Sequence, residues 1–314
     1  MNQVRENQPG ETRTHPALGK TPQRVFVVIN PAAGQDQPIL KSLNKIFQEN
    51  GVDWDIAITK DRGDGRRLAR NAAQSGVDLV MVYGGDGTVM ECASGLVGSQ
   101  TPLAILPGGT ANVMARELGL PLDLVAAATL AINPQSRIRC VDMGQVGEQT
   151  FLLRAGIGFE AEMVEGADRE LKDRLGVLAY GLSALQTLAD PPIARYWLCL
   201  DGAEEECDGV ACVVANSGNM GAADIVLSKS TDISDGLLDV FVVTKADLPS
   251  LVSLVASVVS GRPDPPALKQ WQVREVTIES EPNQPVQLDG ELIGQTPVTV
   301  KILPEAVQII IPPE

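Results

Sequence analysis

The fold of this chain is decided by residues 79–88, which read Leu79-Val80-Met81-Val82-Tyr83-Gly84-Gly85-Asp86-Gly87-Thr88. The first five residues are apolar and predict a buried strand, and a helical pattern follows at residues 89–97. The glycines between them have no Cβ, so backbone N–H groups can approach a ligand closely at the positive end of the helix. This pattern favours a phosphate ligand, although a plain glycine-rich turn with an acidic N-cap has the same sequence.

Two further turns rich in small residues follow strand patterns. Asn30-Pro31-Ala32-Ala33-Gly34 comes after residues 24–29, and Leu106-Pro107-Gly108-Gly109-Thr110-Ala111-Asn112 comes after residues 102–105. In an open parallel sheet, the loops at the carboxyl ends of the strands converge on one crevice, where ligands bind. We therefore expect the three turns to form one phosphate-binding site.

Strands and helices alternate from residue 24 to about residue 140, which predicts an α/β domain with a parallel sheet. The remaining elements expected there are a strand at 53–59 and helices near 38–50, 63–75, 111–118 and 122–132. Residues 1–22 are polar and predict a disordered tail. The first domain is thus assigned to residues 23–140 as a nucleotide-binding domain.

After residue 140 the pattern changes to short strands separated by Asp-Gly and glycine-rich turns, which predicts antiparallel β structure. The expected strands are 151–155, 196–200, 210–215, 237–244, 273–279, 285–288 and 297–302, with helices at 177–188 and 248–259. We assign residues 141–314 to a β-sandwich domain. Residues 306–312 form a last strand pattern, and the sequence leaves open whether it returns to the first domain.

Composition excludes several classes of function. The 314 residues carry a formal net charge of −15, which argues against a nucleic-acid partner and against polybasic docking on a membrane. A local arginine cluster stands out nevertheless: Arg62, Arg66, Arg67 and Arg70. The five cysteines match no zinc spacing and indicate free thiols in a cytoplasmic protein. The only histidine, His15, lies in the polar tail, so a general base would be a carboxylate or a lysine.

Two acidic turns in the second half are candidate sites. Asp289-Gly290-Glu291 has the form of a common hairpin turn, but a carboxylate at its tip could also point into a cleft and accept a proton from a hydroxyl. Glu291 would share a face with Asp289 if the chain stays extended. In the other turn, Asp232 and Asp235 suit a hard cation such as Mg²⁺, and an ordinary Asp-Gly turn is the alternative.

Seven motifs in order resemble the diacylglycerol kinase catalytic-domain family, which includes sphingosine kinases and bacterial lipid kinases. Three are the turns described above, with the 84–88 turn extended to Glu91. The other four are Gly156-Ile157-Gly158-Phe159, Leu175-Gly176 with Ala179-Tyr180, Asp235-Gly236-Leu237-Leu238-Asp239 and Leu288-Asp289-Gly290-Glu291. The resemblance spans roughly residues 24–314 and is specific for the family but not for the lipid.

The resemblance implies a kinase that uses ATP and Mg²⁺, with a cleft between an α/β domain and a β-sandwich domain. The residues that it assigns to the nucleotide are Asn30, Thr59, Gly84, Gly85, Asp86, Gly87, Thr88, Gly109, Thr110 and Asn112. Asp289 corresponds to the catalytic base, with Glu291 and Asp86 beside it. Asp232, Asp235 and the carbonyl of Leu237 correspond to a structural metal site.

Three departures from the family pattern are Met90, Val113 and the segment Leu227-Ser228-Lys229-Ser230. The expected partners are a lipid substrate and, transiently, the membrane periphery, which apolar loop residues would contact; a homodimer stays open. The alternatives are an NAD kinase-like or sugar kinase and a lipid-binding protein that has lost catalysis.

Overall fold

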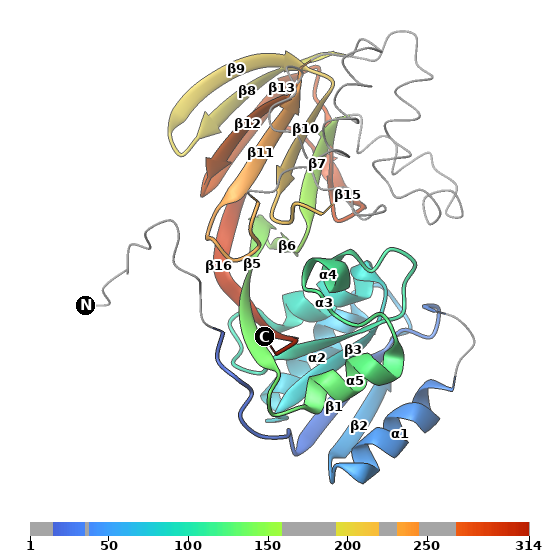
Figure 1. Cartoon of the computed structure of the whole chain (residues 1–314). Coiled ribbons are helices and arrows are strands. Elements are labelled where there is room, and N and C mark those ends of the chain that lie inside the picture. The colour runs from blue at the N-terminus through green and yellow to red at the C-terminus, as the bar shows by residue number, and fades with distance from the viewer. Residues whose placement is uncertain (1–14, 35–37, 159–192, 220–230, 245–267, 314) are drawn as a thin grey trace.

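The computed structural model describes residues 15–34, 38–158, 193–219, 231–244 and 268–313. These residues form two parts, one of helices packed on a sheet and one built of strands alone, joined by a long ribbon (Figure 1). No helix among these residues has the length and apolar character needed to cross a membrane.

The first part contains a sheet of four parallel strands in the order β2-β1-β3-β4. The strands are β1 (Arg24–Ile29), β2 (Asp53–Ile58), β3 (Leu79–Gly84) and β4 (Leu103–Pro107). Every residue of β3 and β4 is buried, as expected for a parallel sheet covered on both faces. The sequence prediction of an α/β domain is confirmed.

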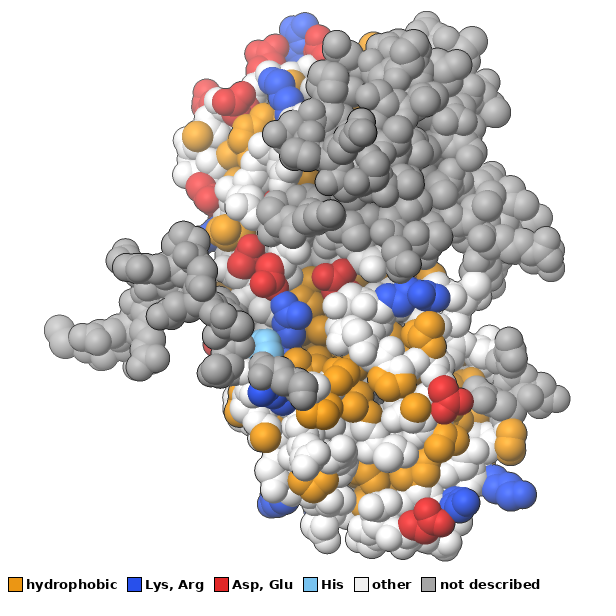
Figure 2. Space-filling view, viewed as in Figure 1, with side chains coloured by type: hydrophobic (Ala, Val, Ile, Leu, Met, Phe, Trp, Pro, Cys, Tyr) orange, Lys and Arg blue, Asp and Glu red, His pale blue; other side chains and the backbone are white. Residues whose placement is uncertain are grey.

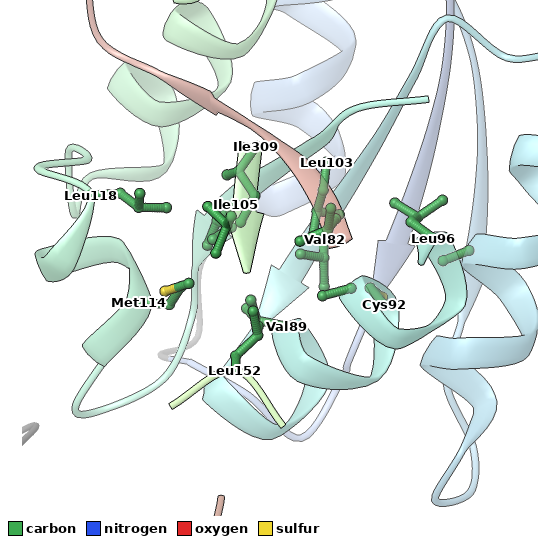
Figure 3. Packing of buried hydrophobic residues seen from close by; sticks show 14 of the residues in the cluster. Val82, Val89, Cys92, Leu96, Leu103, Ile105, Met114, Leu118, Leu152 and Ile309 are labelled. Atoms are coloured by element: carbon green, nitrogen blue, oxygen red, sulfur yellow. The ribbon is translucent and has the colours of Figure 1, made fainter. Parts of the chain in front are cut away.

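Five helices cover the two faces of this sheet: α1 (Ile39–Glu49), α2 (Asp64–Gln74), α3 (Asp86–Leu96), α4 (Val113–Glu117) and α5 (Leu124–Ile132). The apolar stripes of α1 and α5 share one core with β1 and β3. The helices α2, α3 and α4 share the other core, in which Val89 and Met114 pack near Val82 and Ile105 (Figure 3).

Two long strands connect the parts: β5 (Arg137–Val146) and β16 (Val298–Ile311). They pair antiparallel along most of their length. The start of β16 pairs with β13 (Glu275–Glu281) in the second part, and its end runs parallel to β4, with Ile309 opposite Leu103. The last strand pattern of the sequence therefore belongs to the sheet of the first domain.

The second part packs two antiparallel layers against each other. One layer extends the first sheet through β13, β8 (Ala194–Leu200) and β9 (Ala203–Gly209). The other is a six-stranded sheet. Its strands, in spatial order, are β12 (Leu268–Val273), β11 (Leu238–Val243), β10 (Ala211–Ala215), β7 (Arg154–Gly158), β14 (Pro285–Leu288) and β15 (Glu291–Gln295). Alternating side chains such as Tyr196, Leu198, Val240 and Ile278 form the core between the layers. The predicted β-sandwich-like architecture is confirmed.

The structure corrects several details of the sequence prediction. The strand expected at 151–155 is two strands, β6 (Gln149–Phe151) and β7, because the chain turns at Leu152 and Leu153. The strands expected at 297–302 and 306–312 are one strand, β16. The motif that begins at Gly156 lies in strand β7 as far as Gly158. The helices expected at 177–188 and 248–259 lie outside the described residues, as does the segment 227–230.

Part of the segment predicted as an N-terminal tail packs against the first domain. Ala17 bridges to Arg137, and Leu18 N–H donates to the carbonyl of Ser136 at 2.7 Å. Leu18 packs against the core that α1 and α5 share. Residues 16–19 therefore lie along the start of β5 and are not part of a disordered tail.

If β16 completes the first domain, removing a buried side chain near its end will destabilise the whole protein. Ile309 is fully buried between β4 and β5, and Ile309→Ala is expected to cost about 2–5 kcal/mol of unfolding free energy. Leu40→Ala is the matched control, because Leu40 loses the same atoms but is 50% exposed on α1, and we expect a loss below about 1 kcal/mol. Equal losses in the two variants, measured by urea unfolding, would contradict this packing.

Candidate active site

Loops converge at the carboxyl ends of β1 and β3. The strand order β2-β1-β3-β4 means that the chain moves outward from β1 to β2 and then crosses to β3 on the other side. A crevice forms at such a switch point, outside the carboxyl ends of the strands, and ligands of open α/β sheets bind there. The 30–34 turn and the 84–88 turn border this crevice.

Tyr83, the residue before the 84–88 turn, is fully buried. Its ring lies against both the 30–34 turn and the 106–112 turn. A Cβ atom built on Gly34 would overlap the Tyr83 hydroxyl, and one on Gly108 would lie 2.9 Å from the Tyr83 ring. The backbone joins the same turns, since Asn30 N–H donates to the Tyr83 carbonyl and Gly108 N–H to the Gly84 carbonyl, both at 2.9 Å. The three turns expected from the sequence therefore pack together around one ring.

The 84–88 turn and the 106–112 turn, the second and third turns in chain order, touch backbone to backbone. A Cβ atom on Gly109 would lie 2.7 Å from the Cα of Gly85, which leaves no room for a side chain. The side of Gly85 is less restricted, because its Cβ would lie 3.5 Å from Gly109, an ordinary contact. Gly87 has open space, with no atom within 4 Å of a built Cβ.

Two asparagines hold these turns in shape. Asn30 Nδ2 donates to Thr88 Oγ1 at 2.9 Å, which ties the first turn to α3. Asn112 adopts a left-handed conformation with φ 48°, and its side chain both accepts from Gly109 N–H at 2.8 Å and donates to the Gly109 carbonyl at 2.7 Å. Thr110 is exposed at the tip of this turn.

Glu91 connects the glycine turn with the loop that carries Thr59. Its two carboxylate oxygens accept from Gly63 N–H at 2.8 Å and Gly65 N–H at 2.9 Å, at the start of α2. Thr59 N–H donates to the carbonyl of Ile29 at 2.9 Å, so Thr59 stands at the same edge of the sheet as the turns. Sequence reasoning named Glu91 as part of a motif but did not find this bracing role, because its partners lie 28 and 26 residues away.

Asp86 is the first residue of α3 and is partly buried. Its Oδ1 accepts from Met114 N–H at 3.2 Å, at the N-terminus of α4. Burial raises the pKa of Asp86, while backbone N–H groups and the charge of Arg154 act in the opposite direction. Part of the carboxylate is therefore used to hold the third turn in place.

Asp289 occupies the two-residue turn between β14 and β15, with φ 47° followed by φ 92° at Gly290. Its carboxylate accepts three backbone N–H groups, from Leu152 at 2.8 Å, Leu153 at 3.0 Å and Arg154 at 2.9 Å. Burial raises the pKa of Asp289 to about 6, although these N–H groups and the charge of Arg154 lower it. The turn is thus more than a solvent-exposed hairpin tip.

Arg154 contributes positive charge to the surroundings of both candidate carboxylates. It is 8% exposed at the start of β7, and its positive charge lowers the pKa of both Asp86 and Asp289. The charge of one buried arginine therefore acts on a carboxylate of the first domain and on a carboxylate of the second. The sequence analysis missed Arg154, because an arginine inside an apolar strand pattern gives no indication of its neighbours.

The segment 152–154 is fixed by both domains. Leu152 and Leu153 are buried in the core of the first domain, where Leu152 packs beside Val89 (Figure 3). The fully buried Asn216 donates to the carbonyl of Leu152 at 2.8 Å through its side chain and to that of Leu153 at 2.9 Å through its backbone. The loop after β10 therefore begins with a residue that holds the 152–154 segment in place.

The predicted metal residues Asp232 and Asp235 already have partners within the protein. Asp232 accepts from Arg139 and from Ser234 N–H, and Asp235 accepts from Leu237 N–H at 2.9 Å. No group of three metal-ligating side chains occurs in the part of the chain that the structure describes. Burial raises the pKa of Asp235 to about 6, and the charges of Asp232, Asp239 and Asp142 add to this. This excess of negative charge suits a cation at Asp235, whereas Asp232 is already neutralised by Arg139.

Glu291 does not share a face with Asp289, contrary to the sequence expectation. The chain reverses at Asp289 and Gly290, so Glu291 pairs with Leu288 across the hairpin. Its Oε1 lies 3.2 Å from Nη2 of Arg62, which belongs to the loop before α2. Charged side chains of both signs are also seen where the two parts of the molecule meet (Figure 2).

Comparisons with known proteins agree with this geometry. Residues 24–146 match the model of the diacylglycerol kinase catalytic domain, and residues 154–311 match the YegS C-terminal NAD kinase beta sandwich-like domain. The chain belongs to this family of two-domain lipid kinase-like proteins. It is 30% identical to the protein named probable lipid kinase YegS-like of Klebsiella pneumoniae, over 90% of this chain and 94% of that one.

The similarity to two further relatives extends over nearly the whole length of each. The chain is 27% identical to the diacylglycerol kinase of Bacillus subtilis, over 93% of this chain and 97% of the relative. A crystal structure of a diacylglycerol kinase from Bacillus anthracis superimposes with a TM-score of 0.77 at 29% identity, over 93% of this chain and 98% of that one. The family resemblance expected from the sequence motifs is confirmed.

The backbone contact between the second and third turns predicts opposite responses at two glycines. Gly109→Ala places a methyl group against Gly85 and is expected to lower the unfolding free energy by about 1–3 kcal/mol. Gly87→Ala has space and lies in α3, so it is expected to be neutral or to stabilise by up to about 1 kcal/mol. Urea unfolding of both variants checks this packing, and a harmless Gly109→Ala would show that the turns do not touch.

Proposed function

We propose that this protein is an ATP-dependent lipid kinase, which transfers the γ-phosphoryl group of ATP to a hydroxyl of a lipid such as diacylglycerol or a long-chain base. The observation that carries the proposal is that the positive charge of Arg154 acts on both Asp86 of the glycine turn and Asp289 of the second domain. Phosphoryl transfer requires a phosphate site, neutralising charge and a group that orients the hydroxyl. These three requirements correspond to the glycine turns, Arg154 and Asp289.

The nucleotide is proposed to bind in the first domain, with its phosphates along residues 84–88. The N-terminus of α3 supplies the positive end of a helix dipole there. Gly109 and Thr110 would line the phosphates on the other side, and Thr59 would contact the nucleotide from the end of β2. Asn30 and Asn112 hold the turns in the required shape through the hydrogen bonds described above.

Mg²⁺ is the expected companion of ATP and neutralises phosphate charge when bound. A second, structural Mg²⁺ is proposed at Asp235, Asp232 and the carbonyl of Leu237. The excess negative charge around Asp235 supports it, and the pairing of Asp232 with Arg139 limits what Asp232 can contribute.

Asp289 is proposed as the general base. A pKa of about 6 leaves the carboxylate mostly ionised at pH 7 yet basic enough to take a proton from a hydroxyl in the transition state. The three N–H donors fix its orientation, and no covalent intermediate on the protein is needed. Asp86 is proposed to act beside the phosphates and to hold the third turn.

The lipid acceptor implies contact with a membrane surface. Several large apolar side chains of the first domain are exposed, among them Leu40, Ile58 and Val125, and hydrophobic atoms are visible over one face of that domain (Figure 2). They support transient contact through apolar side chains without a basic docking surface. A homodimer remains a prediction that no contact described here tests.

The direct test is transfer of radiolabelled phosphate from ATP to a panel of acceptors. The panel contains diacylglycerol, a long-chain base, a monoacyl lipid, NAD and a simple sugar. Label in any lipid supports the proposal, whereas label in NAD or sugar alone establishes the alternative kinase. Absence of transfer to every acceptor, with ATP binding intact, would indicate a binding protein.

The nucleotide placement predicts that Gly85→Val weakens ATP binding without unfolding the protein. The φ of −85° at Gly85 is accessible to any residue, and the first added atom makes only an ordinary contact with Gly109. The side chain would occupy space where backbone must approach phosphate. Calorimetry should show at least about a tenfold loss in ATP affinity, and unchanged affinity in the folded variant would place the phosphates elsewhere.

The base assignment predicts that Asp289→Asn lowers kcat by about 10²–10⁴-fold while ATP affinity changes little. The wild-type rate should rise with pH through about 6, because the base works only when it is deprotonated, and the variant should lose this limb. Folding stability should have the opposite pH dependence. Because the pKa of Asp289 is higher in the folded protein than in the unfolded chain, its protonated form favours the folded state, and this contribution to the unfolding free energy is lost as pH rises from about 4 to about 6. A variant with kcat within a few-fold of wild type would exclude Asp289 as the base.

A further inference from the structure

The proposed function leaves the arginine cluster around α2 without a role. Arg67 forms an ion pair with Asp64 on its own helix, at 2.6 Å. Arg66 and Arg70 are exposed on α2. Within the described residues, Arg62 is the member of the cluster that forms an ion pair with the second domain, through Glu291 at 3.2 Å.

Arg62 lies on a loop that is fixed by hydrogen bonds to Glu91 and Asp64. Glu91 accepts from Gly63 and Gly65, and Asp64 Oδ2 accepts from Lys60 N–H at 2.9 Å and Asp61 N–H at 3.2 Å. This loop therefore moves with α3 and with the glycine turn that begins it. The Arg62 side chain itself is 76% exposed, so its position depends on its partner and not on packing.

Glu291 stands on the opposite element, directly after the turn that holds Asp289. The strand that it begins, β15, lies at the end of its sheet, with β14 as its neighbour in the order of strands. Because the chain reverses at Asp289 and Gly290, the Glu291 carboxylate does not share the face of Asp289. It forms its ion pair with Arg62 instead. One ion pair thus joins the loop of Thr59 to the turn of Asp289.

Exposed ion pairs contribute little to stability, typically below about 1 kcal/mol. Such a pair can nevertheless fix the relative position of two elements, and displacement of a catalytic group by about 1 Å can cost about 10²-fold in rate. The pair at this place is therefore expected to affect turnover far more than folding.

We propose that Arg62 is a positioning residue, which through Glu291 holds the Asp289 turn at its working distance from the nucleotide loops. This inference rests on the proposed kinase function. It also gives Glu291 a role without proton transfer, because its charge serves to attract Arg62.

The test is a charge-reversal cycle with Arg62→Glu, Glu291→Arg and the double variant. Arg62→Lys is the conservative variant, and Arg70→Glu is the control, because it makes the same charge change on an exposed residue of α2. For each protein, kcat and the KM for ATP are measured with the best lipid acceptor at low salt, together with urea unfolding.

Each single reversal should lower kcat by about 10- to 100-fold, with less than about a threefold change in KM for ATP. The double variant should recover most of the lost kcat, and Arg62→Lys and the control should remain within about twofold of wild type. Losses that simply multiply in the double variant, unchanged kcat in the single variants, or equal damage in the control would each overturn the proposal.

Failure of the kinase function is recognised separately. If wild-type protein phosphorylates no lipid, amide hydrogen exchange at residues 290–292 replaces turnover as the readout. Each single reversal should then speed exchange at this hairpin, and the double variant should restore protection. Unchanged exchange in both single variants would overturn the ion pair as a positioning contact, whatever the protein phosphorylates.

Discussion

The structure depends on three hydrogen bonds from the backbone of Leu152, Leu153 and Arg154 to the carboxylate of Asp289. The leucine side chains belong to the core of the first domain, while Asp289 belongs to a hairpin of the second. Because a core cannot shift without loss of packing, the carboxylate is fixed relative to the glycine turns that share this core. The same three donors and the same burial set its pKa, so position and acidity have one origin.

A second connection comes from the ribbon of β5 and β16, which continues one sheet from the first domain into the second. Buried Asp142 in β5 accepts from Gly236 N–H and Glu305 N–H, both at 2.7 Å, and its carbonyl accepts from Asn216. The Asp232–Asp235 turn is thereby joined through Asp142 and Asn216 to the segment that holds Asp289. A change at that turn can reach Asp289 through hydrogen bonds alone.

Local features of this fold could be predicted from the sequence, because glycine turns and strand patterns are encoded within a few residues. The three turns and their meeting at the sheet edge follow from Gly34, Gly84 and Gly109 and from the alternation of strands and helices. Contacts between distant segments could not be predicted in this way. The bonds from residues 152–154 to Asp289 span 135 to 137 positions, and no pattern near either end announces the other.

Errors arose where one pattern permits two conformations. The apolar run 151–155 predicts a single strand. The chain instead passes from one sheet to the other at Leu152 and Leu153, whose side chains enter the core of the first domain. Glu291 was expected beside Asp289 on an extended chain, and the left-handed turn at Asp289 reverses the chain instead. The pairing of Glu291 with Arg62 depends on that reversal and on the loop before α2 together.

The central claim is that Asp289 is a partly buried, hydrogen-bonded carboxylate whose pKa is set by its burial and by the N–H groups of the 152–154 segment. It is tested most directly by an NMR titration of carboxyl ¹³C signals, with the Asp289 signal assigned by its loss in Asp289→Asn. The structure predicts a midpoint near pH 6 for this signal. A midpoint near pH 4, the value of an ordinary exposed aspartate, would show that the carboxylate is free in solvent and would contradict the claim.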